Sequence, residues 1–356
     1  MSDSIPQRMK ALVQNDASWV SIQEVTVPEL GDNQVLVKVE YAALNPADWK
    51  LAAHMSLPDV IQGADFSGTI VKLGNNLKVP LQVGDNVAGF VHGGNTEDEG
   101  AFAQYLKVDS DLLWKVPEGI KMEDAATIGL TWMTASQVIF SSQKHDLPPT
   151  KVSSDSWYVV YGASSSVGLF AVNIAKTLGY KVLAFASPHS AELVKSYGAD
   201  HVVDYHDSDK AVAEAQEITG GGAKLGFDTI AESGTYQVSV RALGKKGKQL
   251  NAINQASEED KKINPNVEIV NTVVYTIFGK EMNFSPRTPE PFIIPAVPEA
   301  REFATKIYAA TPELITKYGI KPNPVEARGG LEDIEAGLRE LQAGKVSGKK
   351  LVYKID

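Results

Sequence analysis

The chain has 356 residues, of which 43% are hydrophobic and 22% charged, a composition that suits two globular domains with buried cores. Its formal net charge of −10 argues against nucleic acid or an anionic membrane as a partner, because no basic surface is available to neutralise phosphates. The absence of cysteine excludes disulfides, thiolate catalysis and cysteine-bound metal ions. The sequence shows neither a secretory signal nor an apolar run long enough to span a bilayer, so we expect a cytoplasmic protein.

The first part of the chain has the pattern of a β-rich domain. Short β-like runs alternate with breaks that contain Gly, Asn, Pro and Asp, such as Gly31-Asp32-Asn33 and Gly74-Asn75-Asn76. The runs are MKALVQ, VLVKVEYAAL, SGTIVKLG and NVAGFV. We therefore expect a mostly antiparallel, partly barrel-like domain over residues 1–125.

From Trp157 onward, β-rich runs alternate with stretches whose apolar residues recur at helical spacing. WYVVYGA predicts a strand, and the helix that begins at VGLFAV ends at Gly179. The alternation continues through KVLAFA, AELVKSYG, HVVDY and AVAEAQEIT to two further predicted strands, FDTIAES and KQLNAI. Such alternation with short links predicts a parallel, doubly wound sheet, in a domain over residues 126–285.

The last part of the chain contains a proline-rich segment, residues 284–299, which favours a surface loop over a helix or a central strand. Helices are predicted near residues 299–318 and 331–343, and the final strand is KLVYKI. We expect residues 286–356 to return to the first domain and complete it.

The turn GASSSVG, from Gly162 to Gly168, lies between a predicted strand and a predicted helix. A helix N-terminus presents free N–H groups and partial positive charge, and small residues there let a pyrophosphate approach the backbone. Gly162 permits the tight turn, Gly168 permits close packing of helix on strand, and the Ser165 hydroxyl could donate to phosphate. Within a βαβ unit this turn predicts a dinucleotide site, although an unoccupied tight turn would have the same sequence.

The end of the second strand of this domain indicates which dinucleotide is bound. An NAD enzyme normally carries Asp or Glu there to hold the ribose 2′-OH. This strand instead ends in Ser187-Pro188-His189-Ser190, and the next carboxylate is Glu192. Hydroxyls and an imidazole suit a 2′-phosphate, so NADPH is favoured over NADH. The same residues are also typical of a helix N-cap, and the two roles can coexist.

Several motifs occur in the order that is typical of one family. They are Asn45-Pro46-Ala47-Asp48, Gly63-Ala64-Asp65-Phe66-Ser67-Gly68, Gly84-Asp85-Asn86-Val87, the stretch from Gly100 to Tyr105, GASSSVG and Gly198-Ala199-Asp200. Through them the chain resembles the medium-chain dehydrogenases/reductases over essentially its whole length. The resemblance implies an α/β fold with a GroES-like, mostly antiparallel catalytic domain and a Rossmann domain that binds NADPH.

Within this family the chain looks most like the zinc-independent, quinone oxidoreductase-like branch. It is most similar there to the fungal trans-acting enoyl reductases of polyketide synthesis and their yeast-like relatives. The shared stretches are NPADWK, the GLTWMTA region, SPHS, the tyrosine of VVDY, YTIFG and the terminal VSGKKLV.

The resemblance implies which residues lie at the cofactor and which at the substrate. The residues expected at the cofactor are Asp48, Trp49, Lys50, Gly162, Ser164, Ser165, Ser166, Val167, Gly168, Ser187, Pro188, His189, Ser190, Tyr205, Ile253, Asn254 and Ser347. The residues expected at the substrate are Thr134, Thr276, Ile277, Phe278, Gly279 and Lys280. The apolar run VVYTIFG that contains most of the second group is equally typical of a buried strand, and one face could pack while the other lines a channel.

The zinc-dependent members of this family need Cys and His ligands. Here Trp49 and Lys50 follow Asp48, and the six histidines are scattered without a HisxxxHis pair. We therefore expect neither a catalytic nor a structural metal ion.

Lys50 and Thr134 are the candidate catalytic residues. A lysine in an apolar cleft could orient the substrate or cofactor, stabilise developing negative charge or donate a proton. The alternatives are a solvated surface lysine and a threonine hydroxyl that only packs within its helix. Asp48 is expected to order its loop or pair with a cation rather than to transfer protons.

Three functions stay open from the sequence. The first is an NADPH-dependent reductase of a conjugated C=C bond, on a small molecule or on an acyl group borne by a carrier protein. The second is an aldehyde or quinone reductase on the same fold, and the third is a non-catalytic NADPH-binding protein. A monomer is favoured over a homodimer, because the proline-rich segment 284–299 could block pairing at the edge of the sheet.

Overall fold

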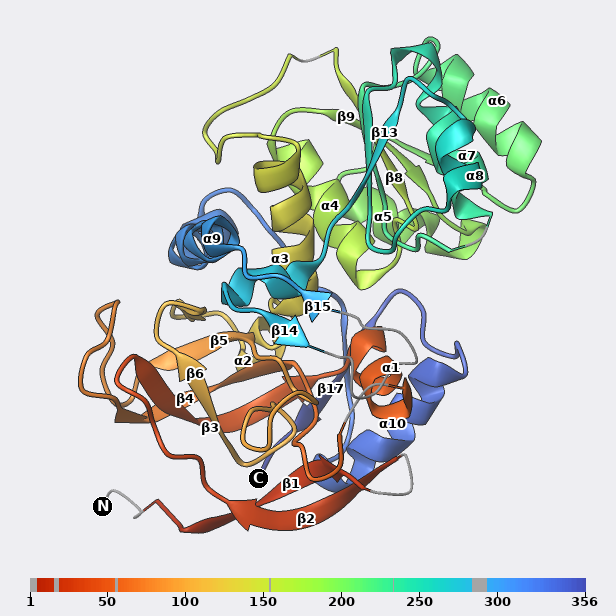
Figure 1. The fold of residues 1–356 in the computed structure, drawn as a ribbon. Coiled ribbons are helices and arrows are strands. Elements are labelled where there is room, and N and C mark those ends of the chain that lie inside the picture. The colour runs from red at the N-terminus through yellow and green to blue at the C-terminus, as the bar shows by residue number, and fades with distance from the viewer. Residues whose placement is uncertain (1–4, 16–18, 55–56, 154, 233, 284–292) are drawn as a thin grey trace. The chain divides into compact units, whose positions relative to one another are not determined.

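A computed structural model of the chain describes all residues except 1–4, 16–18, 55–56, 154, 233 and 284–292 (Figure 1). The chain forms two compact units. Unit 1 consists of Met1–Leu130, Tyr275–Pro312 and Pro322–Asp356, and unit 2 consists of Thr131–Val274 and Glu313–Lys321. None of the helices that the structure describes is long and apolar enough to cross a membrane.

Unit 1 is built on a mainly antiparallel sheet with the strand order β16-β17-β3-β4-β5-β7, in which β6 also pairs with β3. The strands are β3 (Gln34–Ala43), β4 (Asp65–Leu73), β5 (Asn86–Phe90), β6 (Tyr105–Asp109), β7 (Leu113–Lys115), β16 (Val325–Ala327) and β17 (Lys350–Lys354). A separate hairpin pairs β1 (Arg8–Gln14) with β2 (Val20–Thr26). Because β17 pairs with β3, the last strand lies in the same sheet as strands from the first 115 residues.

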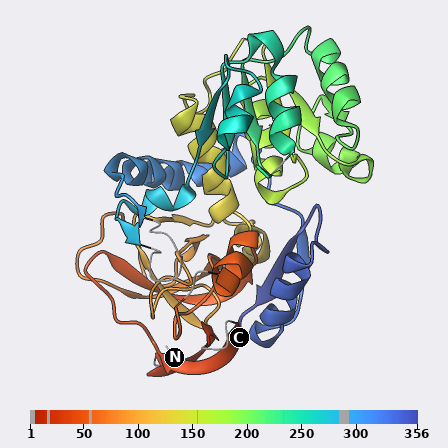
Figure 2. The ribbon, with the colours of Figure 1, turned by 45° about the vertical axis from the view of Figure 1, so that its right-hand side comes forward.

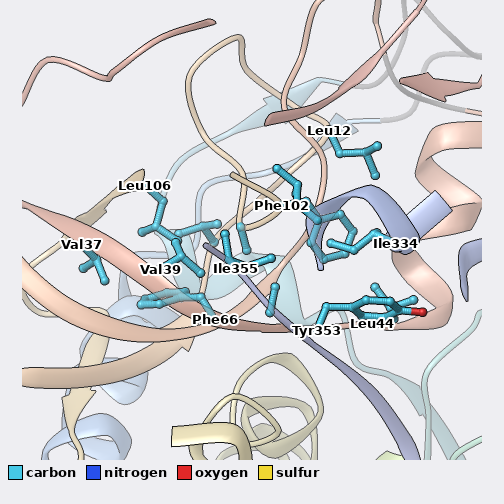
Figure 3. Packing of buried hydrophobic residues seen from close by; sticks show 14 of the residues in the cluster. Leu12, Val37, Val39, Leu44, Phe66, Phe102, Leu106, Ile334, Tyr353 and Ile355 are labelled. Carbon is cyan, nitrogen blue, oxygen red and sulfur yellow. The ribbon is translucent and has the colours of Figure 1, made fainter. Parts of the chain in front are cut away.

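Both faces of β3 are buried, because its odd-numbered and its even-numbered residues both include apolar side chains that pack into a core. Val35, Val37 and Val39 belong to the larger cluster of unit 1, whereas Leu36 belongs to a second cluster, as the two-residue period of a strand requires. Figure 3 shows the larger cluster, which includes Leu12, Leu44, Phe66, Phe102, Leu106, Ile334, Tyr353 and Ile355. This core fixes α1 (Pro46–His54) and α10 (Ile334–Gln342), which contact each other.

Unit 2 is a parallel sheet with the strand order β10-β9-β8-β11-β12-β13, and its helices cover both faces (Figure 2). The predicted parallel, doubly wound sheet is therefore confirmed. The strands are β8 (Trp157–Tyr161), β9 (Lys181–Phe185), β10 (His201–Val203), β11 (Leu225–Asp228), β12 (Gln249–Ala252) and β13 (Glu268–Asn271). The helices between them are α4 (Ser166–Thr177), α5 (Ala191–Ser196), α6 (Ser208–Ile218), α7 (Thr235–Ala242) and α8 (Glu258–Lys262). The strand order reverses between β8 and β11, where ligands of such sheets bind at the carboxyl ends of the strands.

The remaining helices and strands lie outside the strand orders of these two sheets or in the connections between their strands. The short segments are α2 (Met122–Ala125), η2 (Pro188–Ser190), η3 (Gly244–Lys246), β14 (Met282–Asn283), β15 (Ile293–Ile294) and η6 (Leu331–Asp333). The long ones are α9 (Pro298–Thr316) and the helix formed by α3 (Leu130–Ser136) and the π-helix η1 (Gln137–Ser142).

The interpretation of VVYTIFG as a buried strand is wrong, because Val274–Phe278 form the 3₁₀ helix η4. Its β-branched and aromatic residues favour a strand. The chain, however, has just left β13, which is the edge of its sheet, and Gly279 turns with a φ of 66°.

The expected proline-rich loop lies partly outside the described residues, since 284–292 are not described. Of its remainder, Ile293–Ile294 pairs with Met282–Asn283 as a short strand, and Pro298 begins α9. Proline suits a first helical position because it has no N–H to leave unpaired. The loop prediction is therefore wrong at these two places.

Candidate functional site

The turn between β8 and α4 closes through side-chain hydroxyls. Ser165 is the N-cap of α4, and its Oγ accepts the N–H of Gly168 at 2.9 Å. It lies 2.9 Å from Thr229 Oγ1, and the Thr229 hydroxyl lies within hydrogen-bond distance of the Tyr161 and Gly162 carbonyl oxygens. The Ser165 hydroxyl, expected to donate to phosphate, is thus engaged in closing the turn.

Neither glycine of this turn could be replaced by a residue with a side chain without a clash. A Cβ on Gly168 would lie 2.3 Å from the Gly162 carbonyl oxygen, so this glycine is what lets α4 approach β8. Gly162 has a φ of 70°, and a Cβ there would lie 2.5 Å from Ile230 Cγ1. Ser164, Ser166 and Val167 are partly exposed at the helix N-terminus. The turn therefore offers backbone and partial positive charge to an anion.

A second group of predicted cofactor residues meets at the end of β9. Ser187 Oγ lies 2.9 Å from the Tyr205 hydroxyl, which joins residues 18 positions apart. Ser187 is the N-cap of η2, whose Pro188 and His189 are exposed and whose Ser190 is buried. The expected N-cap position and a polar, partly exposed surface are thus both present, with two hydroxyls in contact at the end of β9.

Sequence reasoning missed Asp228 and Thr229, which end β11 beside the reversal of strand order. Asp228 Oδ1 accepts the N–H groups of Ile230 and Ala231 at 3.1 and 2.8 Å, and Oδ2 accepts the Ser239 hydroxyl at 2.9 Å. Burial raises the pKa of Asp228, against the effect of these hydrogen bonds. This carboxylate holds the turn after β11. The predicted strand FDTIAES contains this Asp-Thr pair near its start, but β11 already ends at Asp228, so the sequence did not mark the pair as the end of a strand.

Ile253 and Asn254 directly follow β12, at the same end of the sheet. Asn254 Nδ2 donates to the Ala231 carbonyl oxygen at 3.1 Å, and the Asn254 carbonyl oxygen accepts the Tyr236 hydroxyl at 2.9 Å. Ile253 is partly buried and Asn254 is exposed. These bonds fix the loop that the resemblance assigns to the nicotinamide.

In unit 1, the stretch Asn45 to Asp48 begins helix α1. Asp48 Oδ2 accepts the N–H of Asn45 at 2.6 Å, while the Asp48 N–H donates to the Asn45 carbonyl oxygen at 3.0 Å. Pro46 occupies the first helical position, where its missing N–H costs nothing. The Asp48 side chain is only 2% exposed and is directed into unit 1, so it orders this turn.

A buried ion pair lies beside this turn. Lys350 Nζ donates to Asp65 Oδ2 and, at 2.9 Å, to Asn45 Oδ1, and both charged side chains are at most 1% exposed. Asp65 Oδ1 accepts the N–H of Leu130 at 2.7 Å, and a Cβ on the adjacent Gly129 would lie 2.3 Å from it. Sequence reasoning quoted both charged residues only as parts of motifs and did not pair them.

Burial raises the pKa of Asp48 to about 7, and the nearby Asp65 carboxylate contributes in the same direction. The N–H of Asn45 and the Lys350 ammonium act in the opposite direction but are weaker than the largest cause, burial. Asp48 is therefore protonated over most of the acidic range and adds no charge there beside the ion pair of Asp65 and Lys350.

Of the three predicted cofactor residues in α1, Trp49 and Lys50 have surface available to a ligand and Asp48 does not. Trp49 is partly buried and Lys50 is exposed, with its Nζ 5.7 Å from the centroid of the Trp49 ring. Ser347, in the loop before β17, is also exposed. Thr134 lies in α3 of unit 2 and is 4% exposed.

The predicted substrate segment, Thr276 to Lys280, packs against aromatic residues of unit 1. The Phe278 ring lies 5.4 Å from Phe90 and is nearly parallel to the buried His92 ring at 5.8 Å, while Tyr275 stacks on the His92 ring at 4.4 Å. The Phe278 carbonyl oxygen accepts Arg301 Nη1 at 3.2 Å. Ile277 is buried, Phe278 and Gly279 are partly buried and Lys280 is exposed. Sequence reasoning missed His92 as the residue against which this segment packs.

A small polar pocket of unit 1 lies next to this segment. Its walls include His92, Phe278, Lys280 and Arg301, and the acidic residues Glu99 and Asp109. Lys107 is a third lining cation, and opposite charges pair at the pocket, since Arg301 pairs with Asp109 at 2.8 Å and Lys280 lies 3.8 Å from Glu99. The pocket therefore has no dominant charge of either sign.

Across the part of the chain that the structure describes, no group of three His, Cys, Asp or Glu side chains is arranged to hold a metal ion.

Replacement of Asp48 by Asn should alter how stability depends on pH. A carboxyl whose folded pKa lies near 7 and whose unfolded pKa lies near 4 stabilises the fold below pH 4, and this contribution is lost as pH rises to 7. Asn keeps an acceptor for the Asn45 N–H without the charge. Thermal unfolding followed from pH 5 to 8 should therefore show a flatter profile for Asp48→Asn than for the unmodified chain. Parallel profiles would contradict the protonation of Asp48.

Two family models match successive parts of the chain. Residues 31–118 match the family model described as alcohol dehydrogenase GroES-like domain, and residues 166–283 match the one described as zinc-binding dehydrogenase. The trans-enoyl reductase ACTTS2 of Alternaria alternata is 37% identical over 98% of this chain and 99% of its own length. A zinc-type alcohol dehydrogenase-like protein of Schizosaccharomyces pombe is 33% identical over 98% of this chain and 100% of its own length.

Solved structures share the fold at low sequence identity. The CurK enoyl reductase is similar with a TM-score of 0.76 at 19% identity, over 99% of this chain and 100% of its own. A mycobacterial protein solved in complex with NADPH is similar with a TM-score of 0.74 at 19% identity, over 97% of this chain and 99% of its own. With full-length relatives above 30% identity, the predicted resemblance is confirmed. The chain is an oxidoreductase of the medium-chain dehydrogenase/reductase family, and a relative of the fungal trans-enoyl reductases.

Proposed function

We propose that this chain is an NADPH-dependent reductase that transfers hydride to a C=C bond conjugated to a carbonyl group, without zinc. The observation that carries the proposal is its full-length similarity to proteins named trans-enoyl reductases, and the tight turn between β8 and α4 in unit 2 supports it. A cytoplasmic location, a monomeric state and a carrier-bound acyl substrate stay predictions from the sequence.

The residues of unit 2 fit NADPH. Gly162 and Gly168 allow the tight turn after β8 and the close approach of α4, because a Cβ at either position would clash with neighbouring protein atoms. A turn of this kind offers the N-terminus of its helix to a pyrophosphate. At the end of β9, the hydroxyls of Ser187 and Tyr205 are donors suited to a 2′-phosphate. These hydroxyls favour NADPH over NADH. A chain that binds NADH would be expected to carry Asp or Glu at this position, to hold the ribose 2′-OH.

When bound, the nicotinamide supplies hydride to the β-carbon of the conjugated system. The chain's own residues align the substrate, exclude water and stabilise the negative charge that develops on the conjugated oxygen. We assign charge stabilisation or substrate orientation to Lys50, whose ammonium is exposed beside the Trp49 ring. Thr134 is assigned to orientation through its hydroxyl. The segment from Thr276 to Lys280 is proposed to line the substrate channel, because His92, Phe90 and Arg301 hold it in one shape.

A second candidate function is reduction of an aldehyde or quinone. The similarity to a zinc-type alcohol dehydrogenase-like protein favours it. A fold shared with the quinone oxidoreductase of Coxiella burnetii, with a TM-score of 0.71, is compatible with it. Direct carbonyl reduction in this family usually uses a zinc Lewis acid. The absence of cysteine, from which that zinc draws ligands, makes this candidate the weaker one.

Product analysis with NADPH and trans-2-hexenal separates the candidates, because this substrate carries both a conjugated C=C bond and an aldehyde. We expect hexanal, identified by gas chromatography, and not hexenol. Hexenol as the product would overturn the proposal in favour of carbonyl reduction. If neither forms, the assay is repeated with a crotonyl thioester of N-acetylcysteamine. Continued inactivity with intact NADPH binding would then indicate a non-catalytic protein.

Lys50→Met and Thr134→Val should each lower kcat by about tenfold to a hundredfold, because each removes an interaction with the reacting system. The dissociation constant for NADPH, measured by fluorescence titration, should stay within about twofold. Lys72→Met, another exposed lysine of unit 1, and Thr219→Val, another buried threonine of unit 2, are the controls. Equal kcat values for test and control variants would remove these two residues from the mechanism.

Ser187→Asp should weaken NADPH binding by roughly tenfold or more, since a carboxylate beside the Tyr205 hydroxyl would repel a 2′-phosphate. NADH carries no such phosphate, and its binding should be unchanged or stronger. Ser196→Asp, an exposed position on α5, adds the same charge elsewhere in unit 2. Titrations of both cofactors against both variants measure the difference, and equal losses for NADPH and NADH at position 187 would refute the assignment.

A further inference from the structure

Thr134 lies on a helix whose winding changes before its end. Helix α3 runs from Leu130 to Ser136 and continues directly into the π-helix η1, Gln137–Ser142. The N–H of Gln143 donates to the Val138 carbonyl oxygen at 2.9 Å, five residues back. A π turn contains one residue more than an α turn, and one residue corresponds to a rotation of about 100° about the helix axis. The direction of the Thr134 side chain relative to the end of η1 therefore depends on the π turn.

The end of η1 is bonded to the sheet of unit 2 through two side chains. Ser142 Oγ accepts Asn251 Nδ2 at 2.8 Å and Gln249 Nε2 at 3.1 Å. Gln143 Nε2 donates to Asn251 Oδ1 and to the Gly226 carbonyl oxygen, both at 3.0 Å. These bonds join the helix to β11 and β12, so the end of η1 has a fixed register on the sheet.

Further contacts hold the same end. The Tyr158 hydroxyl donates to Gln143 Oε1 at 2.8 Å, from β8. Beyond η1, the His145 ring contacts the Ile139 carbonyl oxygen at 3.0 Å through Nδ1 and the Tyr180 hydroxyl at 2.7 Å through Nε2. A carbonyl oxygen only accepts, so Nδ1 carries a proton. Because burial lowers the pKa of His145, its neutral form is favoured, and in that form Nε2 accepts from the Tyr180 hydroxyl. The π turn is thus bridged internally and tied to the sheet from three strands.

Asn251 is the centre of this network. It lies in β12 between β11 and β13, where an apolar residue would be expected, and its side chain is 0% exposed. Its Nδ2 also donates to Thr272 Oγ1 at 3.0 Å, and its Oδ1 also accepts Gln249 Nε2 at 2.9 Å. With two donated and two accepted bonds, the amide uses its full hydrogen-bonding capacity. A buried amide that is fully bonded fixes a unique arrangement of its partners, because any displacement leaves polar groups unsatisfied.

We propose that Asn251 is a positioning residue for the reduction: by holding Ser142 and Gln143 it maintains the π turn of η1, and the π turn aims Thr134. This inference rests on the role assigned to Thr134 under the proposed function. Asn251 makes its contacts with the end of the helix, two turns away from Thr134, and acts only through the winding of η1.

Two hydroxyls allow a matched test, since Ser142 and Thr272 both accept hydrogen bonds from Asn251 Nδ2, but only Ser142 belongs to the helix. Ser142→Ala, and the larger change Asn251→Leu, should lower kcat by about tenfold with the KM for NADPH unchanged. Thr272→Val should leave kcat within about twofold. If Ser142→Ala and Thr272→Val reduce kcat to the same extent, the network is only structural and the inference is overturned.

Double variants decide whether the effect passes through Thr134. In a Thr134→Val background, Ser142→Ala should change kcat by less than about twofold, because the hydroxyl that it would misplace is already absent. Effects that multiply would show that Asn251 acts by another route, and would overturn the inference. A Thr134→Val variant with unchanged kcat would overturn both the assignment of Thr134 and the inference built on it.

Hydrogen exchange supplies a readout that does not need turnover. Amides of residues 134–142 should exchange faster in Ser142→Ala than in the unmodified chain, and at unchanged rates in Thr272→Val. If the unmodified chain reduces no enoyl substrate, the proposed function fails while this measurement still tests the network. Equal exchange in the two variants would then overturn the inference separately.

Discussion

The buried salt bridge between Lys350 and Asp65 is the interaction on which unit 1 depends. It joins residues 285 positions apart and reaches the start of α1 through Asn45. A buried charge that loses its partner is strongly destabilising, so the ammonium group holds β4, β17 and the first turn of α1 in a single arrangement. The face of α1 that carries Trp49 and Lys50 takes its orientation from this contact.

In unit 2, neutral side chains make the hydrogen bonds that hold its turn and its helix end in place. The hydroxyls of Ser165 and Thr229 close the turn between β8 and α4, and the amide of Asn251 holds the end of η1. This use of Ser165 explains how a serine can replace the middle glycine of the usual fingerprint. Its side chain bonds back to the turn and leaves the backbone to face a ligand. A Rossmann sheet of this kind can serve different reductases, because residues at the substrate site decide the reaction.

Elements with a strong local period were predictable from the sequence, as α4 and its flanking strands show. Helix α7 was missed because its N-cap, Gly234, has a positive φ and its first turn lacks the usual acidic residue. The stretch from Val274 to Phe278 was interpreted wrongly because strand propensity depends on a neighbouring strand, which the edge of the sheet does not provide. The turn between β8 and α4 and the N-cap at the end of β9 were predictable from local sequence. The contacts of Lys350, Asp65 and Asn251 join distant segments, which spacing alone does not bring together.

The pairing of β17 with β3 gives the two units different histories during synthesis. Most of unit 2 is contained in residues 131–274, so its sheet can form while the ribosome is still adding the later segments. Unit 1 begins first but remains open: the edge of β3 that receives β17 stays unpaired, and Asp65 stays without its ammonium partner, until the final strand emerges. The first segment made is therefore among the last to be completed, and an exposed strand edge in the meantime is a place where a chaperone or a second nascent chain can bind.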